Sequence, residues 1–290
     1  MTDPIVYLNG DFLPLSEARV SVMDRGFLFG DAVYEVIPAY GRRLFRLDEH
    51  LTRLDNSLRA IRMENPLSRD AWRDRLQRLT ECCPDDDQSI YLQVTRGVGA
   101  RRDHAIPSGI EPTVFAMATA MTPPAPGTYA DGIAAITLDD IRWKLCNIKA
   151  TTLLANVLAR AQASDEGAAE AILVRDGKAL EGAASNLFMV ANELLITPPK
   201  SPLLLPGITR DLVLELADTH GVPWCEAEIH ASDLAAADEI WLTSSTKEIM
   251  PVTRLNGEPV GNGRPGPYWE RMTALYRAFI THTREEHPDA

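Results

Sequence analysis

The sequence has little of several features that would assign the protein to a specialised class. Its 290 residues include only four cysteines, and their spacing matches neither a metal site nor a disulfide pattern. We therefore expect reduced thiols, a cytoplasmic location and no bound metal. Asp3 and Pro4 interrupt the start and no long apolar run follows, so we expect neither a signal peptide nor a membrane span.

Basic residues are also scarce compared with acidic ones. The chain has 29 Lys and Arg against 41 Asp and Glu, a formal net charge of −12. Nucleic acids and anionic membranes both require a basic surface, so neither is expected as a partner. Hydrophobic residues make up 45% and charged residues 24%, as in an ordinary soluble globular protein.

The chain is long enough for two ordinary domains, and a proline-rich stretch marks the expected boundary. Residues 123–127 have the sequence Pro-Pro-Ala-Pro-Gly, which is typical of a stiff linker. We therefore expect an N-terminal domain over residues 1–121, a linker over 122–128 and a larger C-terminal domain over 129–290. Alternating and apolar runs predict strands at residues 5–8, 32–40, 89–95, 113–119, 133–138, 171–174, 187–190, 194–197 and 240–242.

A single lysine, Lys149, precedes a helical pattern of apolar residues. The spacing of these residues predicts a helix that packs the stripe into a core. The stripe consists of Leu153, Leu154, Val157, Leu158 and Ala161. Lys149 is then either a surface amine whose stem passes the helix end, or a desolvated amine of lowered pKa that can form a Schiff base with a carbonyl cofactor.

Three further features can bind an anion, although each also has a plainer interpretation. Gly207 precedes a helix that we expect to be capped by Thr209, and such a helix start attracts phosphate even though many carry no ligand. The hydroxyl run 243–246 follows a predicted strand and can cap a turn or hold phosphate oxygens. The loop 98–104 contains two arginines and a histidine and is either solvated or an anion site.

Some charged residues look ordinary when each is considered alone. Arg53 lies off the apolar stripe of a helix that we expect Asp48 to cap, so by default it is solvated. Glu181 beside a glycine is by default a turn residue. On the strand predicted over 32–40, alternation puts Tyr34 and Glu35 on opposite faces. Together, however, an amine, a carboxylate, a phosphate-binding helix start and a hydroxyl cluster are the groups that pyridoxal phosphate requires.

The sequence resembles the fold type IV pyridoxal-phosphate transaminases, and within them the D-amino acid transaminases. The resemblance covers nearly the whole chain, and its motifs occur in order. They are Asp24-Arg25-Gly26 with Phe29-Gly30-Asp31, Val33-Tyr34-Glu35-Val36, Gln93-Val94-Thr95-Arg96-Gly97, Asp140-Ile141-Arg142-Trp143, Ile148-Lys149, Glu181-Gly182 with Ser185-Asn186, Gly207-Ile208-Thr209-Arg210-Asp211, and Thr243-Ser244-Ser245.

The resemblance implies a fold of two α+β domains with pyridoxal 5′-phosphate between them. Lys149 would be the Schiff-base lysine, and Glu181, with Arg142 in its network, would be the partner of the ring nitrogen. The other cofactor-binding residues would be Arg53, Ile208, Thr209, Ser244 and Ser245 at the phosphate and Leu205 near the ring. The substrate carboxylate would be held by Tyr34, Arg102 and His104, the last two reaching in from the second subunit of a homodimer.

The implied activity is a ping-pong exchange of an amino group between a D-amino acid and a 2-oxo acid. Alternatives of the same fold are a branched-chain L-amino acid transaminase and an aminodeoxychorismate lyase. A non-catalytic binding protein is disfavoured because both Lys149 and Glu181 are retained. The chain departs from the family pattern at two places: Arg101 beside Arg102 leaves two registers for the carboxylate-binding loop, and Ala183 and Ala184 replace common serines.

Overall fold

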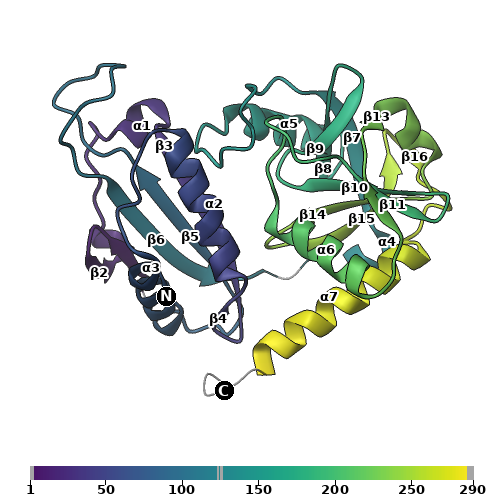
Figure 1. The fold of residues 1–290 in the computed structure, drawn as a ribbon, viewed down its shortest axis with the longest axis horizontal. Coiled ribbons are helices and arrows are strands. Elements are labelled where there is room, and N and C mark those ends of the chain that lie inside the picture. Colours follow the sequence, from purple (N-terminus) through teal and green to yellow (C-terminus); the bar gives the residue numbers. More distant parts are fainter. Residues whose placement is uncertain (1–2, 123, 125–126, 286–290) are drawn as a thin grey trace. The chain divides into compact units, whose positions relative to one another are not determined.

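The computed structural model describes residues 3–122, 124 and 127–285 (Figure 1). Its contacts divide the chain into two compact units: the first is Met1–Thr122, Ile148–Leu153 and Thr283–Ala290, and the second is Pro123–Asn147 and Leu154–His282. Segment 148–153 thus groups with the first unit, although it falls in the range expected for the C-terminal domain, because it pairs with a strand of that unit. Residues 123, 125 and 126 of the expected linker lie outside the described residues.

The first unit contains an antiparallel six-stranded sheet in the order β2-β1-β6-β5-β3-β4 (Figure 1). Its strands are β1 Ile5–Leu8, β2 Asp11–Pro14, β3 Ala32–Tyr40, β4 Arg43–Leu44, β5 Gln88–Thr95 and β6 Thr113–Ala120. Its helices are η1 Leu15–Glu17, α1 Arg25–Phe29, α2 Leu47–Ala60 and α3 Arg69–Cys82. The strands predicted at 5–8, 32–40, 89–95 and 113–119 are therefore confirmed to within one residue.

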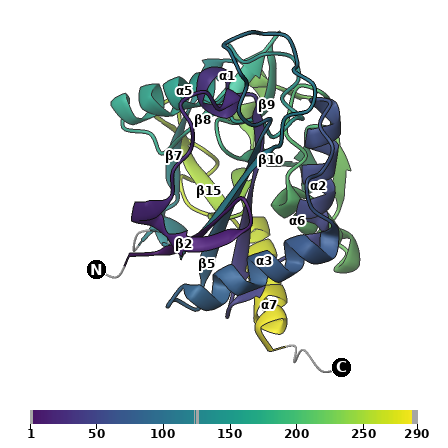
Figure 2. The same cartoon turned by 90° about the vertical axis from the view of Figure 1, so that its left-hand side faces the viewer.

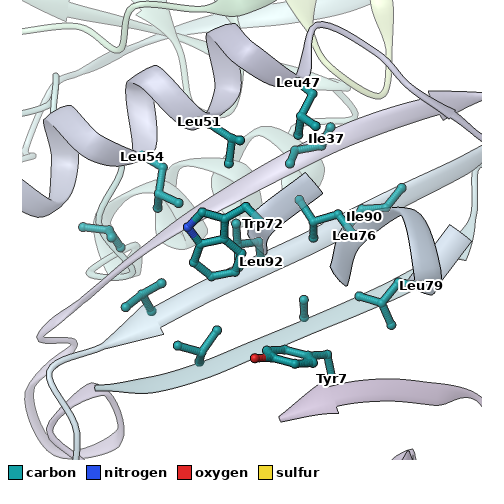
Figure 3. Packing of buried hydrophobic residues seen from close by; sticks show 14 of the residues in the cluster. Tyr7, Ile37, Leu47, Leu51, Leu54, Trp72, Leu76, Leu79, Ile90 and Leu92 are labelled. Carbon is teal, nitrogen blue, oxygen red and sulfur yellow. The ribbon is translucent and has the colours of Figure 1, made fainter. Parts of the chain in front are cut away.

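Helices α2 and α3 cover one face of this sheet, and the core lies between them and the strands. Helix α3 contacts β1, β4, β5 and β6, so it lies across the strands (Figure 2). Leu51 and Leu54 of α2 and Trp72 of α3 point toward Ile90 and Leu92 of β5 (Figure 3). All five side chains are buried. Burial of such a contiguous apolar cluster is the main term stabilising this unit.

The start of α2 differs from the expected one. Asp48 is not the N-cap, because it lies inside the first turn of a helix that begins at Leu47. The N-cap is Arg46, in a left-handed conformation with φ of 54° and with no side-chain cap. The apolar stripe itself is confirmed, since Leu51, Leu54 and Leu58 are buried. Asp48 instead places a negative charge near the positive end of the helix dipole.

The second unit contains a ten-stranded mixed sheet in the order β12-β11-β10-β14-β15-β7-β8-β9-β13, with β16 beside β15. Its strands are β7 Ile133–Asp139, β8 Glu170–Arg175, β9 Lys178–Gly182, β10 Asn186–Ala191, β11 Leu194–Thr197, β12 Trp224–Glu226, β13 Ile229–His230, β14 Glu239–Ser244, β15 Glu248–Leu255 and β16 Glu258–Pro259. Its helices are α4 Thr128–Asp131, α5 Leu154–Asp165, α6 Ile208–Thr219, η2 Ala231–Ala236 and α7 Pro267–Glu285, of which residues 283–285 group with the first unit. An additional pairing of β9 with β10 closes a ring of strands within the sheet.

Helix α5 presents a different face to the core from the one predicted. Leu154, Val157 and Leu158, which were expected to be buried, are 72%, 59% and 52% exposed. The buried residues are Ala159 and Ala163. These alanines pack in a cluster rich in small residues beside β7 and β8, where a helix can approach a sheet closely. The prediction of a helix from the apolar spacing is confirmed, but the prediction that these apolar side chains are buried in the core of this chain was wrong.

None of the helices in the described part of the chain is both long and apolar enough to cross a membrane.

Candidate active site

Lys149 is held by pairing with a strand rather than by the helix that follows. Ala150 forms a β-bridge with Val33. The amide of Tyr34 donates to the Lys149 carbonyl at 2.9 Å, and the Lys149 amide donates to the hydroxyl of Ser57 at 3.2 Å. The Lys149 ammonium nitrogen lies 4.2 Å from the centroid of the Tyr34 ring, a cation–π distance. The side chain is half-buried, so Lys149 is not a freely solvated surface amine.

Arg53 is buried, contrary to the solvated position expected from its place on the helix. Its Nε donates to Oε1 of Glu35 at 2.8 Å and its Nη2 donates to Oε2 at 2.7 Å. His50 Nδ1 lies 2.7 Å from the same Oε2. Burial would raise the pKa of Glu35, but Arg53 and His50 lower it to about 2. Glu35 therefore fixes one edge of the guanidinium.

The two arginines of the loop after Gly97 contact different residues. Arg101 Nη2 lies 3.1 Å from a carboxylate oxygen of Asp103 on the surface. The Arg102 guanidinium lies 5.0 Å from the centroid of the Phe29 ring, and the His104 ring lies 5.2 Å from the same centroid. Because Asp103 already partly neutralises Arg101, Arg102 is the better candidate for a substrate carboxylate.

In the second unit, Glu181 lies on β9 at the point where β9 pairs with β10 and closes the ring of strands. It faces Asn186 across β9 and β10, and the Asn186 amide nitrogen donates to its Oε2 at 3.1 Å. Arg142 Nη1 donates to Oε1 at 2.5 Å, and the amide of Leu205 donates to both oxygens at 3.1–3.2 Å. Arg142 is itself held by Asp140, at 2.8 Å and 3.0 Å. Glu181 is buried inside a strand, so its interpretation as a turn residue was wrong.

Burial raises the pKa of Glu181 to about 7, although Arg142 and the amide of Leu205 oppose this shift. The nearby charge of Asp140 adds to the rise. At neutral pH the positive charge around this carboxyl therefore does not offset its burial, and the group is only partly ionised. The protonated pyridine nitrogen of a bound pyridoxal phosphate would supply more positive charge, in a charge-assisted hydrogen bond.

We expect the cofactor-free protein to become less stable between pH 5 and pH 7 because of Glu181. Its pKa of about 7 in the folded chain exceeds the ordinary value of 4.5, so the folded chain holds a proton that the unfolded chain has released. Raising the pH through this window therefore favours unfolding, by about 2–3 kcal/mol for this group. Urea unfolding of the wild type and of Glu181→Gln at pH 5 and pH 7 measures the difference. Equal pH slopes in the two proteins would contradict the shift.

The start of α6 offers uncapped N–H groups. Gly207 is its N-cap and no side chain caps the first turn, so the expected cap by Thr209 was wrong; Thr209 is the second helical residue and is buried. A side chain at position 207 would overlap the amide oxygen of Asn186, which explains the glycine. The amides and dipole of this helix start suit a phosphate, and phosphate binding here stays a prediction.

The hydroxyl run lies at the end of β14, as expected. Ser244 is the last residue of the strand and Ser245 lies in the turn to β15. Thr243, which belongs to the predicted hydroxyl run but was given no individual role, has a buried Oγ1 without a hydrogen-bond partner among the described residues. It pairs across the strands with Asn186, which pairs with Glu181, so the three share one face of the sheet. This buried hydroxyl is therefore available to bind a polar group from outside the chain.

The sequence analysis gave no individual site role to Glu35, His50, Asp140, Asn186 or Thr243, although all of them except His50 lie in the motifs of the resemblance. Glu35 left one signal, since it is an acidic residue on the strand face whose other members, Val33 and Ile37, are in the core. The others carry no local pattern, because their roles depend on partners distant in sequence. Among the described residues, no group of three or more His, Cys, Asp or Glu side chains is arranged to hold a metal ion.

Comparison with known proteins agrees with this geometry. Residues 32–255 match the family described as amino-transferase class IV, and the chain belongs to this family. It is 39% identical over 279 residues to a D-alanine aminotransferase of Bacillus licheniformis, covering 96% of this chain and 98% of that one. A D-alanine aminotransferase of Listeria monocytogenes is 37% identical over 277 residues, with 95% and 96% covered.

A solved branched-chain amino acid aminotransferase from T.th. with pyridoxamine 5′-phosphate has a TM-score of 0.90 and 27% identity to this chain. The match covers 98% of this chain and 96% of that one. The fold type IV aminotransferase architecture of two α+β units, predicted from the sequence, is thereby confirmed.

Proposed function

We propose that this chain transfers the amino group of a D-amino acid, such as D-alanine, to a 2-oxo acid, such as 2-oxoglutarate, in a ping-pong reaction. Pyridoxal 5′-phosphate is the proposed cofactor. The observation that carries the proposal is the buried Glu181 carboxyl, held by Arg142 and short of positive charge. Similarity to D-alanine aminotransferases over nearly the whole chain supports a D-amino acid as donor.

The residues present fit this cofactor. The orphaned hydroxyl of Thr243 and the uncapped start of α6 can both bind phosphate oxygens. We assign the phosphate to Arg53, Ile208, Thr209, Ser244 and Ser245, and we place Leu205 near the ring. The Leu205 side chain is half-buried, and its amide contacts Glu181, so this assignment keeps the ring and its nitrogen partner together.

When bound, the cofactor supplies a carbonyl carbon that accepts an amino group and a ring that withdraws electrons from the reacting carbon. Lys149 supplies the amine that anchors the cofactor covalently, and it then carries the proton to and from the substrate carbon. Glu181 holds a proton at the ring nitrogen, which preserves the electron-withdrawing power of the ring. Arg142 and Asn186 keep the carboxylate in position for that hydrogen bond.

Handedness depends on where the substrate carboxylate is held. We propose that Tyr34, Arg102 and His104 hold it, with the two loop residues contributed by the second subunit of a homodimer. Exposed apolar residues in each unit support self-association: Leu154 and Val157 on α5 are 72% and 59% exposed. In the first unit, Phe27 is 74% exposed. Exposed apolar side chains of this kind can be covered in a contact between subunits.

Arg102→Ala is expected to raise the KM for D-alanine by roughly 10- to 150-fold, the range for a lost charged hydrogen bond. The cofactor absorbance should not change, because Arg102 is not assigned to the cofactor. Arg101→Ala should have a much smaller effect, since Arg101 already pairs with Asp103. Steady-state kinetics of both variants measure the difference. Reversed effects would place the loop register one residue away.

A donor assay tests the function directly. The purified protein, supplied with pyridoxal 5′-phosphate and 2-oxoglutarate, should form glutamate from D-alanine and not from L-leucine or L-valine. A preference for the branched-chain L-amino acids would instead support the alternative transaminase of the same fold. We further propose a cytoplasmic location, which the four free cysteines support.

A further inference from the structure

We propose that Arg25 is a positioning residue that sets the loop carrying Arg102 and His104, and thereby determines how well the substrate carboxylate is bound. The inference rests on the proposed function, because it takes Arg102 and His104 as the carboxylate-binding pair. Arg25 itself is 5% exposed and lies in α1, outside the loop.

Arg25 holds the loop by its backbone. Its Nη1 donates to the carbonyl of Asp103 at 2.6 Å, and its Nη2 donates to the carbonyl of His104 at 3.5 Å. The Asp103 carbonyl lies between the two proposed substrate ligands, and the other carbonyl belongs to His104, which is one of them. The rest of the loop is mostly exposed, and its other side-chain contacts are local: Asp103 pairs with Arg101 and accepts from the amide of Ala105 at 3.1 Å. Arg25 is therefore a buried attachment point at the part of the loop that matters for binding.

The guanidinium of Arg25 is fixed from its other edge. Its Nε donates to Asp31 Oδ2 at 2.8 Å. Asp31 is held in turn by Arg96, whose Nε and Nη2 donate to it at 2.8 Å and 2.9 Å. Hydrogen bonds to both arginines lower the pKa of Asp31 against the effect of burial, so it stays ionised at neutral pH. Arg25 thus has one orientation, with one edge on Asp31 and the other on the loop.

Phe29 extends the anchor to the functional side chains. The Arg25 and Arg102 guanidinium groups lie 4.9 Å and 5.0 Å from the centroid of this ring, and the His104 ring lies 5.2 Å from it. One buried arginine and one aromatic ring therefore hold the loop backbone and both side chains. Ordering such a loop only on substrate binding would cost conformational entropy at each turnover, which the anchor avoids.

Arg96 provides a matched control. It is also buried, also binds Asp31, and also donates to two backbone carbonyls, but these belong to Ile61 and Arg62 after α2 and not to the loop. Arg25→Met and Arg96→Met each remove one buried arginine and leave Asp31 paired with the other. A general loss of stability should affect both variants, whereas only Arg25→Met should release the loop.

The test combines steady-state kinetics with amide hydrogen exchange on the holoenzyme. Arg25→Met should raise the KM for D-alanine roughly 10-fold or more, as expected for losing charged hydrogen bonds, with little change in kcat or in the cofactor spectrum. Arg25→Lys should be intermediate, because one ammonium cannot serve both edges. Exchange of the amides of residues 99–106 should accelerate in Arg25→Met and stay unchanged in Arg96→Met.

The outcomes separate the inference from the proposed function. If Arg102→Ala raises the KM but Arg25→Met alters neither the KM nor loop exchange, the positioning role is wrong and the function stands. Equal effects of Arg25→Met and Arg96→Met would also overturn the role, since they would indicate general destabilisation. If the wild type does not transaminate D-alanine, the proposed function fails, whereas the loop-exchange comparison still reports whether Arg25 anchors the loop.

Discussion

Lys149→Ala is expected to abolish transamination, with a loss of roughly 10⁴-fold or more. The variant lacks the amine that anchors the cofactor and the group that carries the proton at the substrate carbon, so two steps fail at once. The absorption band of the covalently bound cofactor near the visible edge should disappear with it. Assays with D-alanine and 2-oxoglutarate, together with the absorption spectrum of the purified variant, measure both effects.

Lys144→Ala is the matched control, because Lys144 is an exposed lysine five residues earlier in the same stretch. It should retain both the absorption band and normal turnover. Normal turnover in Lys149→Ala would exclude Lys149 as the anchor. Loss of both properties in the two variants would instead indicate that the whole stretch is sensitive to substitution.

Glu181→Gln is expected to bind the cofactor but to slow the half-reaction with D-alanine by roughly 10²- to 10³-fold, the scale for one lost preorganised interaction. A glutamine keeps the shape of the side chain but cannot supply the negative charge that keeps the ring nitrogen protonated. Arg142 would also lose one of its two charged partners and keep Asp140. Single-turnover absorbance kinetics measure the rate, and cofactor content is determined on the same samples.

Glu239→Gln controls for the loss of any buried carboxyl in the second unit. Glu239 on β14 accepts hydrogen bonds from the amides of Tyr268 and Trp269 at 2.9 Å and 2.8 Å, and from the indole nitrogen of Trp241 at 2.9 Å. Its replacement should lower stability without slowing the half-reaction. An unchanged single-turnover rate in Glu181→Gln, with the cofactor present, would show that Glu181 has a different role.

Features set by local periodicity were predictable from the sequence. The strand at 32–40 and the stripe of α2 were found because alternation and helical spacing are properties of neighbouring residues. Helix α5 shows the limit of this reasoning. Its apolar spacing identified a helix, but spacing alone does not say which face a sheet covers, and here the two alanines are covered instead of the leucines.

In the site, too, local spacing did not predict which side chains are buried. Arg53 was expected in solvent because a helix position indicates only its distance from the apolar stripe. Its burial depends on Glu35, 18 residues away, whose carboxylate makes a buried guanidinium tolerable. A sequence position carries no information about such a partner, so the default was wrong and only the family resemblance pointed to a buried role.

By itself the sequence determined the class of protein, because the ordered motifs around Lys149 and Glu181 are specific when taken together. It also determined most strands and helices, since these follow from local spacing. The tertiary structure alone decided other contacts between distant residues: Arg53 meets Glu35 from 18 residues away, and Arg25 meets the Asp103 carbonyl from 78 residues away. Burial and electrostatic pairing are properties of the packed chain, and they have no local signature from which they could be read in advance.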